Sequence, residues 1–353
     1  MATNQQVSER SRTGGRPTLD EVAARAGVGR GTVSRVVNGS PQVSASAKAA
    51  VENAIRELGY IPNRAARALV TQRTDSVALV VSESEERVFG EPFFAGIIRG
   101  INSMLIETPF QLWLAMAQSK SERDRVEHHL TRQHVDGVLL LSLHGDDPLP
   151  RLLAERNMPV VLCGQPGGQV KIVGDQMSCV DADNAGGAQA AVAHLLARGA
   201  RKPVAIAGPQ DMGVGMARLA GYKAALKAAK LSAPESNIAY GDFSEASGAS
   251  AMRTLLDRHP DLDAVFAASD LMAVGALRVL REHGRRVPQD VAVVGFEDSV
   301  IARQTEPALT TVHQPVEAMG RESARLLVAH IRGEDVPAPL VVLDTHLVVR
   351  AST

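Results

Sequence analysis

Two arginines near the N-terminus have the residue type and spacing to contact DNA bases. Arg30 and Arg35 lie in the stretch VGRGTVSRVVNG, residues 28–39, whose valines recur at helical spacing. A guanidinium forms two parallel hydrogen bonds to O6 and N7 of guanine, so arginines on the polar side of a helix suit base readout in a major groove. The stretch therefore predicts a short recognition helix over about 30–37.

Gly31 stands between these arginines, where glycine lowers helix propensity by ~1 kcal/mol relative to alanine. We interpret it as a source of clearance, because a helix without a Cβ there can approach the base edges closely. Nearby hydroxyl and amide side chains suit phosphates, which set register rather than sequence. An ordinary surface helix with two arginines is the alternative. The predicted DNA contacts of this helix are Arg30, Gly31, Thr32, Ser34, Arg35 and Asn38.

Two further helices are predicted to support the recognition helix. The first begins with a T-x-x-E capping box at Thr18, the third runs from about 44 to 58, and a glycine follows each. A helix, a turn containing glycine and a second helix with a polar outer face form a helix-turn-helix arrangement. We therefore expect an all-α DNA-binding headpiece over 18–61, after a disordered arm at 1–17.

The charge of the chain is distributed unevenly. Residues 1–73 carry eleven Lys or Arg against five Asp or Glu, although the whole chain has a formal net charge of −1. A basic N-terminal region joined to an acidic remainder indicates that only the N-terminal region binds a polyanion. A solvated basic tail is the alternative.

Beyond residue 75, apolar runs alternate with amphipathic helical patterns in about eight βα units. Such runs between helices predict parallel sheets covered on both faces. A break at Gly-Ala-Arg-Lys-Pro, residues 199–203, divides this α/β core into two doubly wound sheets, whose strand ends would face a cleft suited to a small ligand. We expect an N-subdomain of 76–200 and 314–336, and a C-subdomain of 201–313 and 337–353.

The segment 62–75 joins the two regions. It is alanine-rich and favours a helix, but its run PNRAARAL is too short to be a stable helix in water. We expect a hinge helix and linker that order only with help. A charged linker without that role is the alternative.

Two long motifs resemble the headpiece of the lactose-repressor (LacI/GalR) family of bacterial transcription regulators. They are TLDEVAARAGVGRGTVSRVVNG at 18–39 and GYIPNRAARAL at 59–69, and the resemblance continues to residue 353. It implies a periplasmic-binding-protein-like core and a homodimer that represses transcription from a palindromic DNA operator until a small sugar effector releases it. In the hinge it implies a minor-groove helix with Leu69 wedged between base pairs. The implied hinge contacts are Asn63, Arg64, Arg67 and Leu69.

The resemblance also implies effector contacts, matched residue by residue. The arginine in ARLAGY would bind hydroxyls or carboxylates of the effector. The aromatic residue in YGDFSEASG would pack against a sugar ring. The turn in VVGFEDS has Glu297 where the family more often has aspartate. Helix capping and core packing are the alternatives for several of these positions. The candidates are Phe93, Phe94, Asp183, Asn184, Arg218, Phe243, Ser269, Asp270, Glu297 and Gln314.

Two further stretches indicate the class of the effector. SESEERVFGEPFFAGIIRGI and FAASDLMAVGAL are similar to regulators of cellulose or β-glucoside use, which implies a β-linked disaccharide. A nucleobase or another metabolite that acts as corepressor is the alternative.

Other function classes lack their motifs. The sequence has no Walker A stretch and no G-x-S-x-G elbow, and its two cysteines, Cys163 and Cys179, have no zinc spacing. We therefore expect no enzyme activity, no metal and no cofactor. No run of about 18 apolar residues occurs, so a cytoplasmic protein without a membrane partner is expected.

Overall fold

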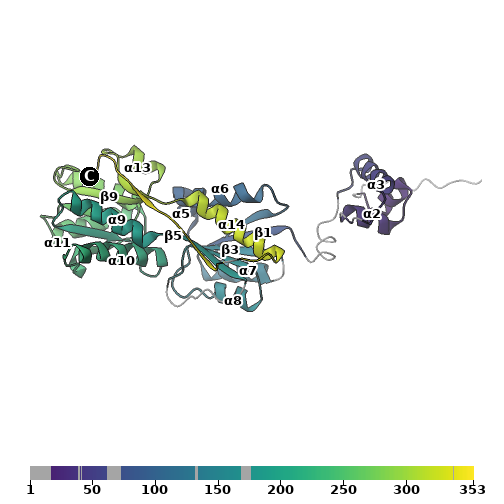
Figure 1. Ribbon diagram of the computed structural model, residues 1–353, viewed down its shortest axis with the longest axis horizontal. Coiled ribbons are helices and arrows are strands. Elements are labelled where there is room, and N and C mark those ends of the chain that lie inside the picture. The colour runs from purple at the N-terminus through teal and green to yellow at the C-terminus, as the bar shows by residue number, and fades with distance from the viewer. Residues whose placement is uncertain are drawn as a thin grey trace, which may run out of the picture. The chain divides into compact units, whose positions relative to one another are not determined.

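The structure is a computed structural model in which the chain divides into two units, residues 1–74 and 75–353 (Figure 1). The described residues are 17–38, 40, 42–61, 73–131, 134–167, 176–336 and 338–353. The predicted arm up to residue 16 and the predicted hinge contacts Asn63, Arg64, Arg67 and Leu69 lie outside them. In the described part of the chain, no helix is both long and apolar enough to cross a membrane.

The described part of the first unit forms three helices, α1 (Leu19–Ala26), α2 (Arg30–Val37) and α3 (Ala45–Leu58), as predicted. Thr18 and Glu21 cap α1 reciprocally, because each backbone N–H donates to the other side chain. Glycines in the left-handed conformation, Gly27 and Gly59, follow α1 and α3. The helices enclose a small core of Val22, Ala23, Val33, Val51, Ala54 and Tyr60.

The second unit, here called the core, contains two six-stranded sheets. The first sheet is parallel throughout, in the order β11-β5-β4-β3-β1-β2. Helices α6 and α14 pack on one face and α7 and α8 on the other, so both faces are buried as predicted for apolar strands. The strands are β1 (Ser76–Val81), β2 (Gln111–Met116), β3 (Gly137–Leu141), β4 (Val160–Cys163), β5 (Met177–Ala182) and β11 (Leu340–Leu343). The helices are α5 (Glu85–Gly90), α6 (Pro92–Leu105), α7 (Lys120–Thr131), α8 (Leu149–Glu155) and α14 (Val316–Arg332).

The second sheet has the order β12-β10-β9-β8-β6-β7, and only β12 runs antiparallel to its neighbour. Its strands are β6 (Pro203–Ala207), β7 (Ile238–Tyr240), β8 (Ala264–Ala267), β9 (Ala292–Glu297), β10 (Thr310–His313) and β12 (His346–Val348). Its helices are α9 (Asn184–Ala197), α10 (Gly213–Ala228), α11 (Glu245–Arg258), α12 (Asp270–Glu282) and α13 (Val300–Gln304), with a 3-10 turn at Glu235–Asn237.

The chain crosses between these two halves after β5, after β10 and after β11, and Figure 1 shows the crossing segments. The predicted boundaries at 200 and 337 are wrong. Residues 184–197 form α9, which packs on the second sheet, and residues 340–343 form β11, which pairs with β5 in the first sheet. The Gly-Ala-Arg-Lys-Pro break is instead a helix-to-strand loop inside the second half, entered through Gly199 at a φ of 104°.

Close packing of α6 on α14 fixes one wall of the space between the halves. A Cβ on Gly100 of α6 would collide with the backbone carbonyl of Glu317 in α14, so the helices approach each other over a residue without a side chain. The same packing brings the first turns of α6, which carry Phe93 and Phe94, beside the start of α14, which follows Gln314.

Candidate functional site

The outer side of α2 presents the two arginines that the sequence predicted. Arg30 and Arg35 are exposed: Arg30 Nη1 lies 3.6 Å from Asp20 Oδ2, and Arg35 Nε donates to the Gly31 carbonyl at 3.2 Å. Exposed contacts of this kind contribute little to stability. Both guanidinium groups are therefore available to exchange these contacts for base edges.

The space around Gly31 is open. Among the described residues, a Cβ built at this position would meet only Arg35 Nη2, at 4.0 Å, so no packing in the described part of the headpiece requires glycine. Thr32 and Ser34 are half-buried beside it, and Asn38 Nδ2 donates to Ser34 Oγ at 3.4 Å. The absence of an internal packing reason is consistent with a glycine that serves an external contact.

In the core, a buried arginine gathers three segments of the chain. Arg218, in α10, is 2% exposed and donates to Asn184 Oδ1 at 2.9 Å, to the Ala268 carbonyl at 2.6 Å and to Gln314 Oε1 at 3.0 Å. Asn184 and Gln314 lie at two of the crossings between the halves. The planar guanidinium suits this role because its donors point in fixed, divergent directions.

Arg218 also faces an acid and an aromatic ring. Its guanidinium carbon lies 3.8 Å from the centre of the Phe296 ring, and its Nη1 lies 3.6 Å from Glu297 Oε1. Burial raises the pKa of Glu297, and the positive charge of Arg218 opposes that shift. Glu297 has a φ of 114°, a conformation that costs free energy and recurs at ligand sites. The pair thus offers one donor group and one acceptor group at the base of a cleft.

This cleft lies between the two halves of the core and holds about 710 Å³ of space, part of it open to solvent. The predicted effector contacts that line it are Phe93, Phe94, Arg218, Phe243, Glu297 and Gln314. The predicted contacts that do not line it are Asp183, Asn184, Ser269 and Asp270.

Those four residues support the lining residues. Asp183 caps α9 by accepting from Gly186 N at 2.8 Å, and Asn184 holds Arg218. Ser269 caps α12, and its hydroxyl donates to the Phe243 carbonyl at 3.2 Å. Capping, which the sequence left open as the alternative for both pairs, is what Asp183 and Ser269 do here.

Asp270 lies beneath the loop that carries Glu297. It accepts from the Thr311 hydroxyl at 2.5 Å and from Ser299 N at 2.7 Å. Burial raises the pKa of Asp270 to about 6, although these hydrogen bonds lower it. This carboxyl holds the loop in place and has no free path to the cleft, since its side chain is fully buried.

Phe243 turns its ring into the cleft through a strained backbone. Its φ is 73°, and its ring packs so closely on Gly208 that a Cβ at that glycine would collide with it. The ring centre lies 5.9 Å from the Arg218 guanidinium carbon. An apolar ring face beside charged groups suits a ligand with both hydroxyls and C–H surfaces.

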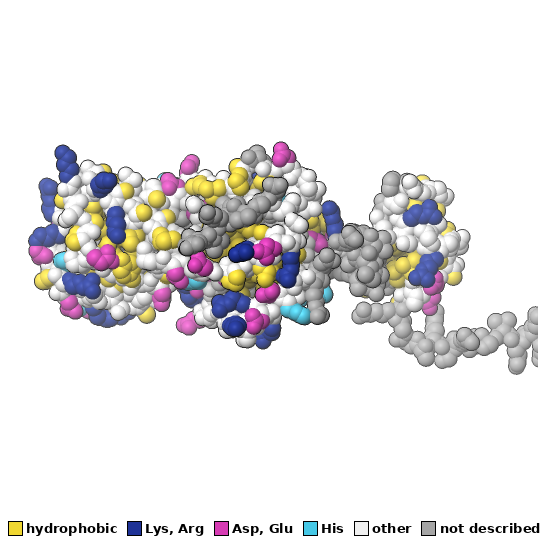
Figure 2. All heavy atoms as spheres, turned by 90° about the horizontal axis from the view of Figure 1, so that it is seen from below, with side chains coloured by type: hydrophobic (Ala, Val, Ile, Leu, Met, Phe, Trp, Pro, Cys, Tyr) yellow, Lys and Arg dark blue, Asp and Glu magenta, His cyan; other side chains and the backbone are white. Residues whose placement is uncertain are grey.

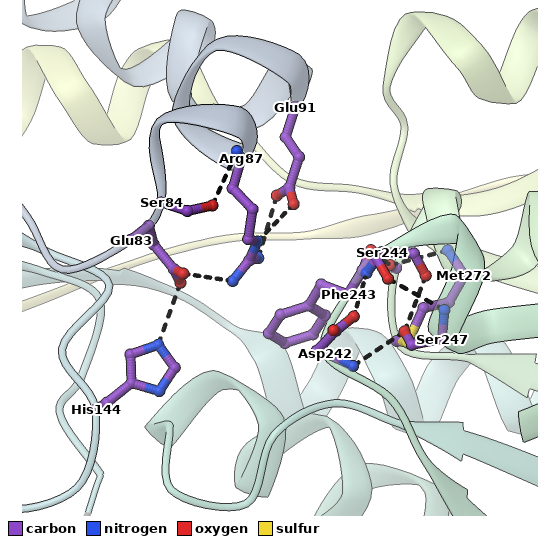
Figure 3. Close-up of polar contacts among 11 residues, drawn as sticks. Glu83, Ser84, Arg87, Glu91, His144, Asp242, Phe243, Ser244, Ser247 and Met272 are labelled. Atoms are coloured by element: carbon purple, nitrogen blue, oxygen red, sulfur yellow. Dashed lines mark hydrogen bonds and ion pairs between the residues drawn. The ribbon is translucent and has the colours of Figure 1, made fainter. Parts of the chain in front are cut away.

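The sequence analysis missed Glu83 and Arg87, which form an acid–base chain with Glu91 on the first half of the cleft (Figure 3). Arg87, in α5, donates to the two oxygens of Glu91 at 2.7 and 3.2 Å, and its Nη1 lies 2.6 Å from Glu83 Oε2. Glu83, Arg87 and Glu91 are spaced at i, i+4 and i+8, a pattern that could have identified the pairs from the sequence. Arg87 and Glu91 line the cleft.

A second missed group forms a polar floor next to Arg218. Gln165 Nε2 donates to Asp181 Oδ2 at 3.2 Å, and Asn184 Nδ2 donates to Asp181 Oδ1 at 3.0 Å. Burial raises the pKa of Asp181, and hydrogen bonds from Ala182 and Gln165 oppose that shift. The network therefore runs from Gln165 through Asn184 to Arg218, across both halves.

On the face drawn in Figure 2, side chains of both charges lie over the described part of the core, Lys and Arg as well as Asp and Glu. Mixed surfaces of this kind are ordinary for a soluble domain.

Comparisons with known proteins agree with these features. Residues 18–63 match the family described as bacterial regulatory proteins, lacI family, and residues 192–353 match a periplasmic binding protein-like domain. Among curated proteins, the chain is 58% identical to the HTH-type transcriptional regulator CelR of Thermobifida fusca, over 96% of this chain and 98% of that protein. It is 34% identical to the HTH-type transcriptional repressor PurR of an Escherichia coli strain, over 95% and 96%.

Two solved structures are similar over 96% of this chain. One is a complex of the transcriptional regulator CelR with cellobiose, at 55% identity and a TM-score of 0.76, covering 100% of that chain. The other is the lac repressor dimer bound to operator and the anti-inducer ONPF, at 27% identity and a TM-score of 0.82, covering 99% of that chain. With its helix-turn-helix headpiece and its periplasmic-binding-protein-like core, the chain belongs to the lacI family of bacterial regulatory proteins.

Proposed function

We propose that the protein is a homodimeric repressor that binds a palindromic operator through α2 and is released when a β-linked disaccharide, cellobiose or a close relative, enters the cleft. The observation that carries this proposal is the cleft floor, where the Arg218–Glu297 pair stands beside the Phe243 ring. Hydroxyls need donors and acceptors, whereas the C–H face of a pyranose needs an apolar platform. The cellobiose complex of the CelR relative supports the choice of ligand.

The headpiece supports the DNA half of the proposal. Arg30 and Arg35 are exposed on the same helix and separated by an open glycine position. A single recognition helix reads few base pairs, so a two-fold pair of half-sites is needed for adequate specificity. The lac repressor relative is a dimer on operator, which supports the same arrangement here.

The two sites communicate by linkage in this proposal. A ligand that contacts both halves of the core favours one angle between them, and a dimer converts that angle into the spacing of its headpieces. Coupling free energies of ~1–3 kcal/mol are typical and correspond to roughly 5–150-fold in affinity.

The test is a DNA-release titration. Fluorescence anisotropy of a labelled duplex from upstream of the protein's own gene should fall as cellobiose is added at fixed salt, because affinity for DNA depends strongly on salt. Arg35→Ala should abolish preference for that duplex over random DNA, whereas Arg56→Ala, an exposed arginine of α3, should retain it. Operator binding that no saccharide weakens would refute the inducer half of the proposal.

A corepressor is the second candidate. In the solved lac repressor structure, the dimer is bound to operator and to the anti-inducer ONPF together, so a member of the family can hold another ligand while it is bound to DNA. A nucleobase or other metabolite acting in this way would raise the anisotropy of the same duplex. The sign of the ligand's effect therefore separates the two functions.

A further inference from the structure

We propose that Glu83 and His144 are positioning residues, which transmit contact between the two halves of the core to Arg87 in the cleft wall, and that this connection requires a proton on His144. The proton then acts as a second effector of the cleft. The effect on sugar binding rests on the proposed function, whereas the contact between the halves can be tested without a sugar. Arg87 lines the cleft and Glu83 and His144 do not, so they act on it through Arg87.

The two halves touch at a rim of the cleft, where their backbones come close together. A Cβ on Gly167 of the first half would collide with the Asp211 carbonyl, and a Cβ on Gly213 of the second half would collide with the Gln165 carbonyl. The backbone N–H of Gly145 also donates to the Asp211 carbonyl at 2.9 Å. Gln165 and Gly213 line the cleft, so contact at this rim closes one side of it. The rim consists of residues 144–145, 165–167 and 211–213.

A row of side chains runs from this rim into the cleft wall. His144 Nδ1 lies 2.9 Å from Asp211 Oδ2, and His144 Nε2 lies 3.2 Å from Glu83 Oε1. The other oxygen of Glu83 lies 2.6 Å from Arg87 Nη1 (Figure 3). Arg87 in turn donates to Glu91, and both line the cleft. The orientation of Arg87 thus depends on Glu83, and Glu83 is held by the residue that contacts the second half.

The position of His144 suits a protonated imidazole. Each of its ring nitrogens faces a carboxylate, and an imidazolium donates from both nitrogens. A neutral ring has one donor and one acceptor, so one of the two carboxylates would face a lone pair. The Glu83 side chain is only 7% exposed, which limits its access to water as a replacement donor. Loss of the proton therefore weakens either the rim contact or the hold on Glu83.

The surroundings of His144 favour its charged form. The hydrogen bond with Glu83 raises the pKa of His144, partial burial opposes that shift, and Asp211 raises the pKa further. Because Asp211 contributes only while the rim is closed, closure takes up protons near neutral pH. The stabilisation of the closed rim is complete below the ordinary value of ~6.5 and is lost as the pH rises through the raised value. The charged groups on the elements around His144 are Glu83, Arg87, Asp146, Asp147 and Asp211.

The first experiment measures closure of the rim in the full chain without sugar or DNA. Spin labels on Pro148→Cys and Met216→Cys report the distance across the rim by double electron–electron resonance, because both positions are exposed and lie within five residues of the contact along the chain. The native cysteines, Cys163 and Cys179, are buried and should not take up label. The population at short distance should fall between pH 5.5 and pH 8.5, and His144→Gln should remove most of this pH dependence.

The second experiment measures cellobiose binding to the full chain by isothermal titration calorimetry over the same pH range. The unaltered protein should bind cellobiose about tenfold more tightly at pH 6 than at pH 8.5, the effect expected for one hydrogen bond between charged groups. His144→Gln should reduce this ratio to about twofold or less. Asp211→Asn should do the same, because it removes the charge but keeps the size of the side chain and the backbone carbonyl. Glu155→Gln, which alters an exposed pair with Arg151, is the matched control and should retain the full ratio.

The outcomes separate the inference from the proposed function. If His144→Gln and Asp211→Asn both keep the full pH dependence of cellobiose binding, or if the distance across the rim does not respond to pH, the role of His144 is overturned while a sugar-responsive repressor remains. If the unaltered protein binds no saccharide, the proposed function fails, and the spin-label distances still decide whether the rim contact requires the proton.

Discussion

His144 of the first half bonds directly to Asp211 of the second, with 2.9 Å between His144 Nδ1 and Asp211 Oδ2. The other ring nitrogen, Nε2, lies 3.2 Å from Glu83 Oε1, and the backbone N–H of the next residue, Gly145, donates to the Asp211 carbonyl. A protonated imidazole donates from both nitrogens, so it can satisfy both carboxylates at once. The contact ties the two halves of the core together.

This contact should make the closeness of the two halves depend on pH. The hydrogen bond with Glu83 raises the pKa of His144, against the effect of partial burial, and Asp211 raises it further. A raised pKa means that the stabilising contribution is complete below the ordinary value of ~6.5 and is lost as the pH rises through the raised value. We predict that His144→Gln lowers the midpoint of thermal unfolding of the core most at pH 6 and progressively less towards pH 8.5.

A matched substitution and a direct titration check the origin of that effect. His128→Gln, at an exposed position of α7, should give no pH-dependent difference. The NMR titration of His144 should show a pKa above the ordinary histidine value of ~6.5. A His144 pKa below the ordinary histidine value would contradict the proposed interaction.

Arg218→Lys should separate effector binding from operator binding. Lysine keeps a positive charge opposite Glu297 but cannot donate to Asn184, Ala268 and Gln314 in the same three directions. At least one buried acceptor would lose its partner, which costs ~1–3 kcal/mol of the free energy of unfolding. We expect urea unfolding to show this loss, and cellobiose to leave the variant bound to operator. Arg99→Lys, at an exposed position of α6, is the control. If cellobiose releases the Arg218→Lys variant from operator normally, the role assigned to Arg218 is wrong.

Gly31→Ala should stabilise the headpiece and weaken its binding to DNA. Alanine raises helix propensity by up to ~1 kcal/mol, and the added Cβ meets only Arg35 Nη2 at ordinary contact distance. The same Cβ would stand between α2 and the base edges, so we predict at least about a tenfold loss of operator affinity together with a higher unfolding midpoint.

The reverse change in a neighbouring helix makes this test specific. Ala49→Gly, at an exposed position of α3, should lower the unfolding midpoint by a similar amount. If Gly31→Ala binds operator more tightly than the unaltered protein does, glycine does not provide clearance at this position.

Local patterns were sufficient for the headpiece and for the layers of the core. The T-x-x-E box at Thr18 and the left-handed glycines Gly27 and Gly59 fix the ends of helices within a few residues, and each is visible in the sequence alone. Continuous apolar runs likewise identified buried parallel strands, because such strands are covered on both faces.

The crossings between the halves could not be read in this way. β11 pairs with β5, more than 150 residues earlier in the chain, and nothing in the four residues Leu-Val-Val-Leu distinguishes a strand of the first sheet from one of the second. The assignment depends on non-local pairing, so the composition break at 199–203 was misleading.

The same limit applies within the site. A carboxylate or hydroxyl directly before a helix reads alike whether it caps the helix or binds a ligand, and Asp183 and Ser269 prove to be caps. The spacing of Glu83, Arg87 and Glu91 predicts ion pairs, but it cannot say that Arg87 and Glu91 line a cleft.

The most direct test of the account is reciprocity between the cleft and the operator. The factor by which saturating cellobiose weakens operator binding should equal the factor by which saturating operator weakens cellobiose binding, since both report one coupling free energy. We predict equal factors, in the range of roughly 5–150-fold, when both are measured in the same buffer at the same salt. Cellobiose that binds with the same affinity whether or not operator is present would contradict the account.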